Sequence, residues 1–416
     1  MDPLSGPTFN RPAMKTSPRW LRWFSLAGAL ALAVSVTAQS GDKPPANLDA
    51  LLEPVIARAK IPGMAALVLR GDRVIAQGIA GVRKQGAPER ITLDDQFELC
   101  SATKAMTAML AALLVEEGKA HWNTTLGEIF ADTPGLDRTW NQVTLRQLLA
   151  QRAGITGSHP ISFLTSVRSA PGDLPRQRRD FATKLLAHGP DIPPGNKFVY
   201  SPVNYILAGA VLERITGQSW ESLMQERLYR PLGIASGGFG PPGTPGQVDQ
   251  PWGHGHRRLW QVPLPGPGDT PFDPGSDQAD YPLASGPAGL AHMTIKDWAR
   301  FVTLHLRADP ANPHRQVTLL KADTFAQLHG LESGEKEYAA GWFVGTRLWA
   351  KGPRTGDTGR VLFHAGDNGR WNTVVWIAPE LDFAMLIVCN RGGVSGPVDK
   401  VAGALTRYAP LPPAAD

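Results

Sequence analysis

The chain has 416 residues, of which 42% are hydrophobic, which is enough to bury a large core in one or two domains. Its formal net charge is only +5, and no Lys/Arg run is interleaved with aromatic residues, so the sequence does not indicate nucleic-acid binding. Two cysteines exclude a disulfide scaffold or a cysteine metal cluster. We expect Cys100 and Cys389 to be free buried thiols, although export would permit a bridge between them.

The N-terminal segment is typical of an export signal. Three basic residues between positions 15 and 22 precede the apolar run 23–36, and small residues up to Ala38 suit a cleavage site. We therefore predict a signal peptide over 1–38, a linker over 39–46, and a periplasmic or secreted mature protein. The apolar run is short for a membrane anchor, which is the alternative, so no stable membrane insertion is expected after cleavage.

The remaining chain predicts one domain over 47–410 and a short tail over 411–416. Both ends of this domain contain strand patterns, and the region of about 101–330 between them is mostly helical, apart from Gly- and Pro-rich loops over 233–290. This order predicts an α+β (mixed α/β) fold, in which an antiparallel sheet built from both chain ends is flanked by helices. The predicted strands are 63–69, 74–79, 340–344, 360–364, 373–378 and 383–389, and the predicted helices are 48–60, 105–118, 143–151, 205–216, 220–228, 295–306 and 398–408.

Ser101-x-x-Lys104 lies at the start of the apolar helix predicted over 105–118. Residues three apart share a helix face, so the hydroxyl and the amine form a candidate nucleophile and base. Burial disfavours the charged ammonium, which would let Lys104 accept the hydroxyl proton. The spacing occurs three times, but the copies that begin at Ser40 and Ser333 precede no apolar helix and are interpreted as coincidences.

Two further segments contain groups that could act with Ser101. Tyr200 lies just before a helix that begins at Ser201-Pro202, so its hydroxyl could be directed inward to relay a proton. His364 ends the strand predicted over 360–364 and Gly366 follows it, and the glycine permits close approach of another chain or a ligand. The backbone N–H of Asp367 could then face a carbonyl oxygen, with His364 beside it as a donor or a cation. Each residue taken alone also suits a structural role.

In this order, Ser101-x-x-Lys104, Tyr200-Ser201 and His364-x-Gly366 resemble the motifs of the serine β-lactamase and penicillin-binding family. The resemblance covers about residues 48–408 and is strongest to the branch of class C β-lactamases, D-alanyl-D-alanine carboxypeptidases, D-aminopeptidases and β-lactamase-like esterases. Weaker matches surround the motifs: Gly154-Ile155, Pro194-Gly195, Tyr205-x-Leu207-x-Gly209, Pro231-Leu232-Gly233, Gly286-x-Ala288-Gly289 and Trp376-x-Ala378-Pro379.

The resemblance implies a mechanism. Ser101 would attack a carbonyl and become acylated, while Lys104 and Tyr200 would share the general-base and general-acid work. The backbone N–H groups of Ser101 and Asp367 would form an oxyanion hole. His364 would line the pocket and place hydrogen bonds or positive charge near the substrate. Water would then release the acyl group, with no metal or cofactor.

One departure from the family pattern bears on specificity. The second motif of the family usually ends in an asparagine that holds the substrate amide, whereas this chain has Pro202 there; a separate departure, Gln151 where relatives commonly have histidine, concerns only local packing. We therefore expect an exported serine hydrolase acting on small ester or amide substrates. The alternatives are a class C-like β-lactamase or D-alanyl-D-alanine carboxypeptidase, and a non-catalytic penicillin-binding sensor. The oligomeric state stays open.

Other polar residues receive structural interpretations. His254 and His256 are two apart, but no third ligand can be assigned to them, so a loop is preferred to a metal site. Asp94, Asp95 and Glu98 precede Ser101 and are expected to form a solvated turn.

Overall fold

The computed structural model describes residues 44–156, 172–256, 270–331 and 337–410, with the backbone of two short strands, β7 (Arg258–Leu259) and β8 (Val262–Pro263). The predicted signal peptide, the tail and the Ser-x-x-Lys copies at Ser40 and Ser333 lie outside the described residues.

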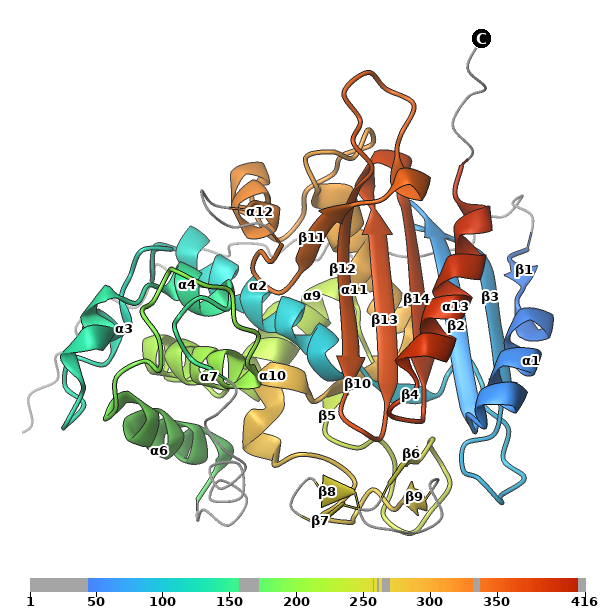
Figure 1. Ribbon diagram of the computed structural model, residues 1–416, viewed down its shortest axis with the longest axis horizontal. Coiled ribbons are helices and arrows are strands. Elements are labelled where there is room, and N and C mark those ends of the chain that lie inside the picture. The colour runs from blue at the N-terminus through green and yellow to red at the C-terminus, as the bar shows by residue number, and fades with distance from the viewer. Residues whose placement is uncertain are drawn as a thin grey trace, which may run out of the picture. The chain divides into compact units, whose positions relative to one another are not determined.

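Strands from both ends of the domain form one seven-stranded sheet in the described chain, in the order β1-β3-β2-β14-β13-β12-β11 (Figure 1). Except for the parallel β1–β3 pair, neighbouring strands are antiparallel, and β14 pairs with β2 to join the two chain ends, as at Leu386 and Leu67. The predicted sheet is therefore confirmed. Its strands are β1 (Ala46–Asn47), β2 (Gly63–Arg70), β3 (Arg73–Gly81), β11 (Phe343–Thr346), β12 (Arg360–Asp367), β13 (Asn372–Ala378) and β14 (Phe383–Cys389).

The first of the C-terminal strands lies later in the chain than predicted. We expected a strand over 340–344, but β11 begins at Phe343. Gly341 has a φ of 83°, and a Cβ at this position would lie 2.5 Å from the Cα of Ala105. A left-handed turn pressed against a helix therefore occupies the predicted strand start.

Helices cover both faces of the sheet. Successive residues of its central strands point to opposite faces, so alternate residues pack into two different cores. Met64, Ala66 and Val68 pack with α1 (Asp49–Ala59) and α13 (Ser395–Leu405). Their neighbours Ala65, Leu67 and Leu69 belong to the larger core, which contains α11 (Ile295–Ala308) and the helical region. The two cysteines are free and buried, as expected.

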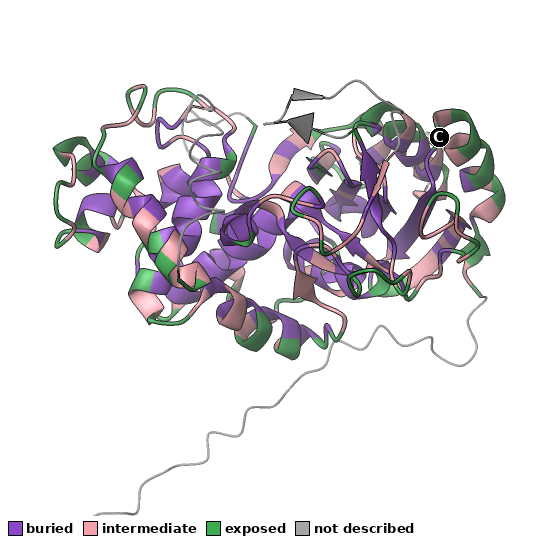
Figure 2. Cartoon of the chain, turned by 90° about the horizontal axis from the view of Figure 1, so that it is seen from below, coloured by how far each residue is buried: buried purple, intermediate pink, exposed green. Residues whose placement is uncertain are grey.

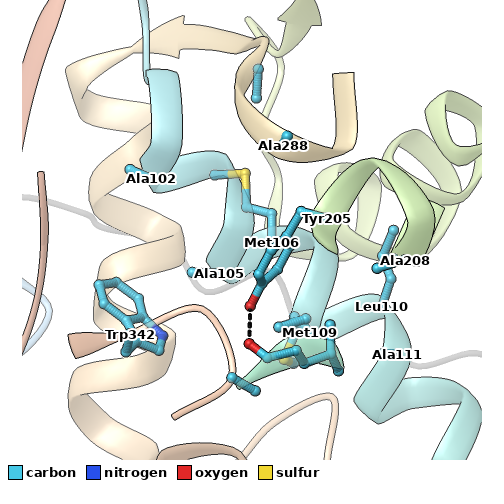
Figure 3. Packing of buried hydrophobic residues seen from close by; sticks show 14 of the residues in the cluster. Ala102, Ala105, Met106, Met109, Leu110, Ala111, Tyr205, Ala208, Ala288 and Trp342 are labelled. Atoms are coloured by element: carbon cyan, nitrogen blue, oxygen red, sulfur yellow. Dashed lines mark hydrogen bonds between the residues drawn. The ribbon is translucent and has the colours of Figure 1, made fainter. Parts of the chain in front are cut away.

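The helical region packs around α2 (Thr103–Glu116), whose residues from Thr103 to Leu114 are all buried. Figure 3 shows Tyr205 and Ala288 packed against this helix, and the Tyr205 hydroxyl donates to the Leu149 carbonyl at 2.8 Å. Buried residues are concentrated in this interior and in the sheet (Figure 2). The other helices of the region are α3 (Leu126–Ile129), α4 (Leu145–Leu149), α6 (Leu174–Leu186), α7 (Pro202–Thr216), α8 (Trp220–Leu223), α9 (Arg230–Leu232), α10 (Gly286–Gly289) and α12 (Ala322–His329).

Short strands form smaller sheets separate from the seven-stranded one. β4 pairs with β10, which also pairs with β5, and β6 pairs with β9. Their bounds are β4 (Gln96–Glu98), β5 (Gly238–Phe239), β6 (Gly253–Gly255), β9 (Thr270–Phe272) and β10 (Ala291–Thr294). β4 leads directly into the 3₁₀ turn η1 (Cys100–Ala102), which carries Ser101. Among the described helices, none combines the length and the apolar character needed to cross a bilayer.

Candidate active site

Ser101 and Lys104 are in direct contact at the junction of η1 and α2. The Lys104 Nζ lies 3.0 Å from the Ser101 Oγ and donates to the Ala288 carbonyl at 2.6 Å. The Lys104 side chain is fully buried, and Thr107 fixes the adjoining backbone of α10 by donating to the Pro287 carbonyl at 2.8 Å. The amine is therefore held at one position beside the hydroxyl by a carbonyl far away in the sequence.

Strand β12 passes very close to the backbone that carries Ser101. A Cβ added to Gly366 would lie 2.6 Å from the Cβ of Cys100 and 2.8 Å from the Leu99 carbonyl oxygen. Cys100 itself adopts a φ of 47°, which is uncommon for a residue with a side chain. Glycine at 366 permits this contact, and it brings the end of β12, at Asp367, beside η1.

The β11–β12 ladder ends at the Phe343–Phe363 pair, so His364 to Asp367 extend beyond the end of β11. The Asp367 carboxylate accepts the backbone N–H of Gly369 at 2.7 Å and that of Gly393 at 2.7 Å. Its side chain is thus used to hold the turn between β12 and β13.

Tyr200 lies beside Lys104, with its ring centroid 5.0 Å from the Nζ. As predicted, α7 begins at Pro202 with Ser201 at the preceding position, although in the described chain the Ser201 hydroxyl does not cap the helix. Instead, the buried Gln151 accepts the Ser201 N–H at 3.0 Å and the Asn204 side-chain amide at 2.6 Å. Gln151 therefore positions the segment that carries Tyr200, and Asn204 is turned into this buried network.

Aromatic side chains form a wall around Tyr200. Its ring stacks on Phe343 at a centroid distance of 6.2 Å, and Tyr338 meets the same Phe343 edge-on at 4.8 Å. Phe198 adjoins Tyr338 at 5.5 Å. Tyr200, Phe198 and Phe343 are each only partly buried, so the wall presents apolar surface next to the hydroxyl and amine.

His364 completes this wall but is not a cation. Burial, and secondly the charge of the nearby Lys104, lowers the pKa of His364 to about 3. A neutral ring that donates from Nδ1 to the Ala365 carbonyl at 2.8 Å accepts the Tyr338 hydroxyl at Nε2, 3.2 Å away. Both ring nitrogens then have partners, and of the two roles expected for His364, donor or cation, its lowered pKa disfavours the cation.

The exposure of the side chains tests two further interpretations from the sequence, the solvated turn before Ser101 and the role of His254. Asp95 and Glu98 are almost fully buried, and only Asp94 of the expected solvated turn is exposed. Asp95 pairs with Arg83 at 2.7 Å, which a polar sequence pattern does not reveal. His254 is also buried: its Nδ1 bonds the Asn390 carbonyl at 2.9 Å and its Nε2 accepts the Gln85 N–H at 3.0 Å. His254 lies in strand β6 and not in the expected loop, and its ring is held by these backbone partners.

Sequence reasoning did not identify three contributors to the site. The Ala288 carbonyl belongs to a segment noted only as a weaker motif match, the Tyr338 hydroxyl to a segment with no recognisable local signal, and Gln151 was noted only as a departure from the family pattern. Each acts through a partner more than 20 residues away.

A model of the Beta-lactamase family matches residues 48–408, and the chain belongs to that family.

Among its relatives, the unguisins hydrolase ungD' of Aspergillus campestris is 26% identical over 369 residues, which cover 86% of this chain and 64% of that protein. The D-amino acid amidase of Ochrobactrum anthropi SV3, complexed with L-phenylalanine, has a TM-score of 0.66 at 20% identity and covers 87% of this chain and 98% of its own. A class C beta lactamase from Rhodobacter sphaeroides has a TM-score of 0.63 at 18% identity, covering 86% and 98%. The solved structures support the fold, and the chain spans 62–64% of the length of the curated relatives it matches.

Proposed function

We propose that this protein is a serine hydrolase that acts through an acyl-enzyme on small, uncharged esters or amides. The observation that carries the proposal is the buried Lys104 amine, held 3.0 Å from the Ser101 hydroxyl by the Ala288 carbonyl. A hydroxyl with a base at hydrogen-bond distance, and a third group orienting that base, is the arrangement that activates a nucleophile.

In the proposed first step, the Ser101 Oγ bonds to the substrate carbonyl carbon and its proton passes to the Lys104 side chain. The Tyr200 hydroxyl protonates the departing alkoxide or amine as the carbon–leaving-group bond breaks, and Lys104 returns a proton to Tyr200. Water attacks the acyl-enzyme by the same route in reverse and releases the acid. The N–H groups of Ser101 and Asp367 would stabilise the oxyanion formed in each step.

The surroundings of His364 support uncharged substrates. A neutral ring whose two nitrogens both have partners offers neither charge nor a free donor to a carboxylate. Phe198 and Phe343 add apolar surface beside it, and Pro202 supplies no side-chain amide. Esters and amides without a free carboxylate at this position should therefore be preferred over cell-wall peptides and β-lactams.

Covalent labelling tests the nucleophile. A fluorophosphonate probe should label the purified protein, and peptide mapping should place the adduct on Ser101. Ser101→Ala should abolish labelling and lower ester turnover by ~10³-fold or more while retaining the fold. Ser333→Ala, which removes the serine of another Ser-x-x-Lys copy, is the matched control and should label like the parent. Peptide mapping that places the adduct of the parent protein on a residue other than Ser101 would refute the assignment.

A substrate panel tests the specificity. Rates on a p-nitrophenyl ester, a D-amino-acid amide and a cephalosporin should rank the cephalosporin last. A cephalosporin hydrolysed fastest would favour the β-lactamase alternative, and a stable penicillin adduct without turnover of any substrate would favour the sensor.

We also propose that the protein is exported after cleavage near Ala38, on the evidence of the basic and apolar N-terminal pattern. N-terminal sequencing of the protein recovered from periplasm or medium should begin close to Gln39. A protein found only inside the cell with its first residues intact would contradict this proposal.

A further inference from the structure

A polar cluster that includes the buried residues Glu98 and Asn368 adjoins the candidate site. Asn368 directly follows Asp367 in the turn between β12 and β13, and its Nδ2 donates to Glu98 at 2.7 Å and to Asp280 at 3.0 Å. The side-chain Oδ1 of Asn368 accepts the backbone N–H groups of Arg370 at 3.0 Å and Trp371 at 2.9 Å. One side-chain amide thus holds its own turn and binds two carboxyl groups.

The three side chains come from the three segments that build the site. Glu98 ends β4, three residues before Ser101. Asp280 lies in the loop that leads to α10, where the Ala288 carbonyl binds Lys104. Asn368 adjoins Asp367, whose N–H is the second proposed oxyanion donor. A shift of any one side chain would therefore be transmitted to the others.

Both carboxyl groups bind the same Asn368 amide nitrogen, so they lie side by side, and the charge of Asp280 acts on Glu98. Glu98 is 0% exposed. Asp280 is half-buried, and a second carboxylate held beside it on the same amide is costly to ionise inside the protein, so Glu98 is the group expected to keep its proton.

We propose that Glu98, Asp280 and Asn368 form a proton-sharing clasp that positions the Asp367 N–H against Ser101. This inference rests on the proposed function, because it concerns the geometry of that oxyanion hole. In the clasp, Glu98 is the neutral partner that donates to Asp280, while Asn368 donates to both. These are positioning residues, since they act on the reacting groups through the backbone.

The electrostatics around the pair favour the same arrangement. Burial, followed by the charge of Asp280, raises the pKa of Glu98 well above its ordinary value, and burial also raises the pKa of Asp280. The Arg370 guanidinium offsets the charge of Asp280 from the β12–β13 turn. It is itself fixed by the carbonyls of Gln278 and His256, both at 2.9 Å.

The remaining titratable neighbours do not supply a cation to Glu98. His292 lies opposite it in the β4–β10 ladder, where burial lowers the pKa of the imidazole and Nδ1 bonds the Gly240 carbonyl at 2.6 Å. Burial raises the pKa of the Cys100 thiol, with the charge of Glu98 as the second cause. The Asp367 carboxylate adds a further negative charge near Cys100. Loss of the shared proton would therefore leave two carboxylates repelling each other.

The expected consequence is loss of acylation at alkaline pH. Once the second carboxylate forms, the pair separates, the Asn368 turn moves with it, and the Asp367 N–H leaves its position beside Ser101. Because an oxyanion donor acts on the transition state, the loss should fall on kcat and on the rate of labelling, with KM little changed.

The test compares Glu98→Gln and Asn368→Asp with the parent, using fluorophosphonate labelling rates and ester kcat and KM from pH 6 to 10. Glutamine can donate to Asp280 and accept from Asn368 without titrating, so Glu98→Gln should move the alkaline decline upward by at least about one pH unit. Asn368→Asp adds a third carboxyl group and should slow labelling at pH 7 at least about tenfold. Glu380→Gln is the control, because Glu380 is a buried carboxylate that accepts backbone N–H groups such as that of Gly359 at 2.8 Å, outside the clasp.

Circular dichroism and thermal unfolding establish that each variant is folded, and Glu98→Gln alone decides the question if Asn368→Asp does not fold. Glu380→Gln should lower the unfolding temperature but keep the parental pH profile. An alkaline decline at the same pH in Glu98→Gln and parent would overturn the clasp, as would a folded Asn368→Asp that labels at the parental rate. A parent protein that is not labelled at Ser101 would instead refute the proposed function.

Discussion

Gly366 offers the most direct test of the contact between β12 and the Ser101 backbone. In Gly366→Ala, the new methyl would lie 2.6 Å from the Cβ of Cys100, 2.7 Å from the Thr373 Oγ1 and 2.8 Å from the Leu99 carbonyl oxygen. Carbon atoms in contact normally lie about 3.5–4.0 Å apart, so the two segments must separate by roughly 1 Å.

None of these neighbours can move freely. The Leu99 N–H donates to the Ala291 carbonyl at 2.8 Å, and the Thr373 hydroxyl donates to the Leu99 carbonyl at 3.0 Å. Overpacking of this kind costs roughly 1–3 kcal/mol of unfolding free energy. Displacing the Asp367 N–H by about 1 Å should lower kcat roughly 10²-fold, with a smaller change in KM.

Ester hydrolysis and urea unfolding measure the two effects. Gly345→Ala is the matched control, because a methyl at that position of the adjacent strand β11 meets only the flexible Arg347 side chain, at 3.7 Å. The control should change kcat less than about twofold. If Gly366→Ala keeps the parental kcat, or if Gly345→Ala loses as much, the close contact does not position the oxyanion donor.

Two further predictions concern stability. The pKa of His364 is about 3 in the folded protein, against an ordinary value of 6.5, so the unfolded chain takes up this proton first as the pH falls. The contribution of His364 to the unfolding free energy is therefore fully present above pH 6.5 and is lost as the pH falls towards 3. Lowering the pH from 7.5 to 4.5 should cost about 3 kcal/mol of unfolding free energy through His364. Urea unfolding at the two pH values should show a smaller loss in His364→Gln, and an equal loss would contradict the assignment. Separately, the buried Arg178 binds Glu213 at 2.6 Å and Glu221 at 2.7 Å. Arg178→Met leaves both carboxylates without this partner and should cost about 3–5 kcal/mol, whereas Arg176→Met, at an exposed pair on the same helix, should cost less than about 1 kcal/mol. Equal losses of unfolding free energy in the two arginine variants would refute the claim that the buried Arg178 pairs stabilise the fold more than the exposed Arg176 pair.

Features that depend on local periodicity could be predicted from the sequence. Short apolar runs separated by turn residues indicated the strands at both chain ends, and an apolar run ending near Gly118 indicated the helix behind Ser101. The Ser101–Lys104 contact was also accessible, because a spacing of three residues lies within one helical turn. In each of these features the residues that meet are close together in the chain, or recur with the repeat of the helix or strand that carries them.

The charge states and partners of the site depended on the tertiary structure. Glu98 was expected in a solvated turn, yet it is buried beside Asn368, which donates to both Glu98 and Asp280. Both partners are far from Glu98 in the sequence. His364 was a candidate cation until burial and the Tyr338 hydroxyl defined it as neutral.

Whether a polar group is desolvated, and which group compensates for it, is a property of segments that meet only after folding. The sequence by itself therefore determined which elements form and which motifs they carry. The tertiary structure decided how those motifs are charged, held and brought into contact, because solvation and hydrogen bonding are set by non-local neighbours.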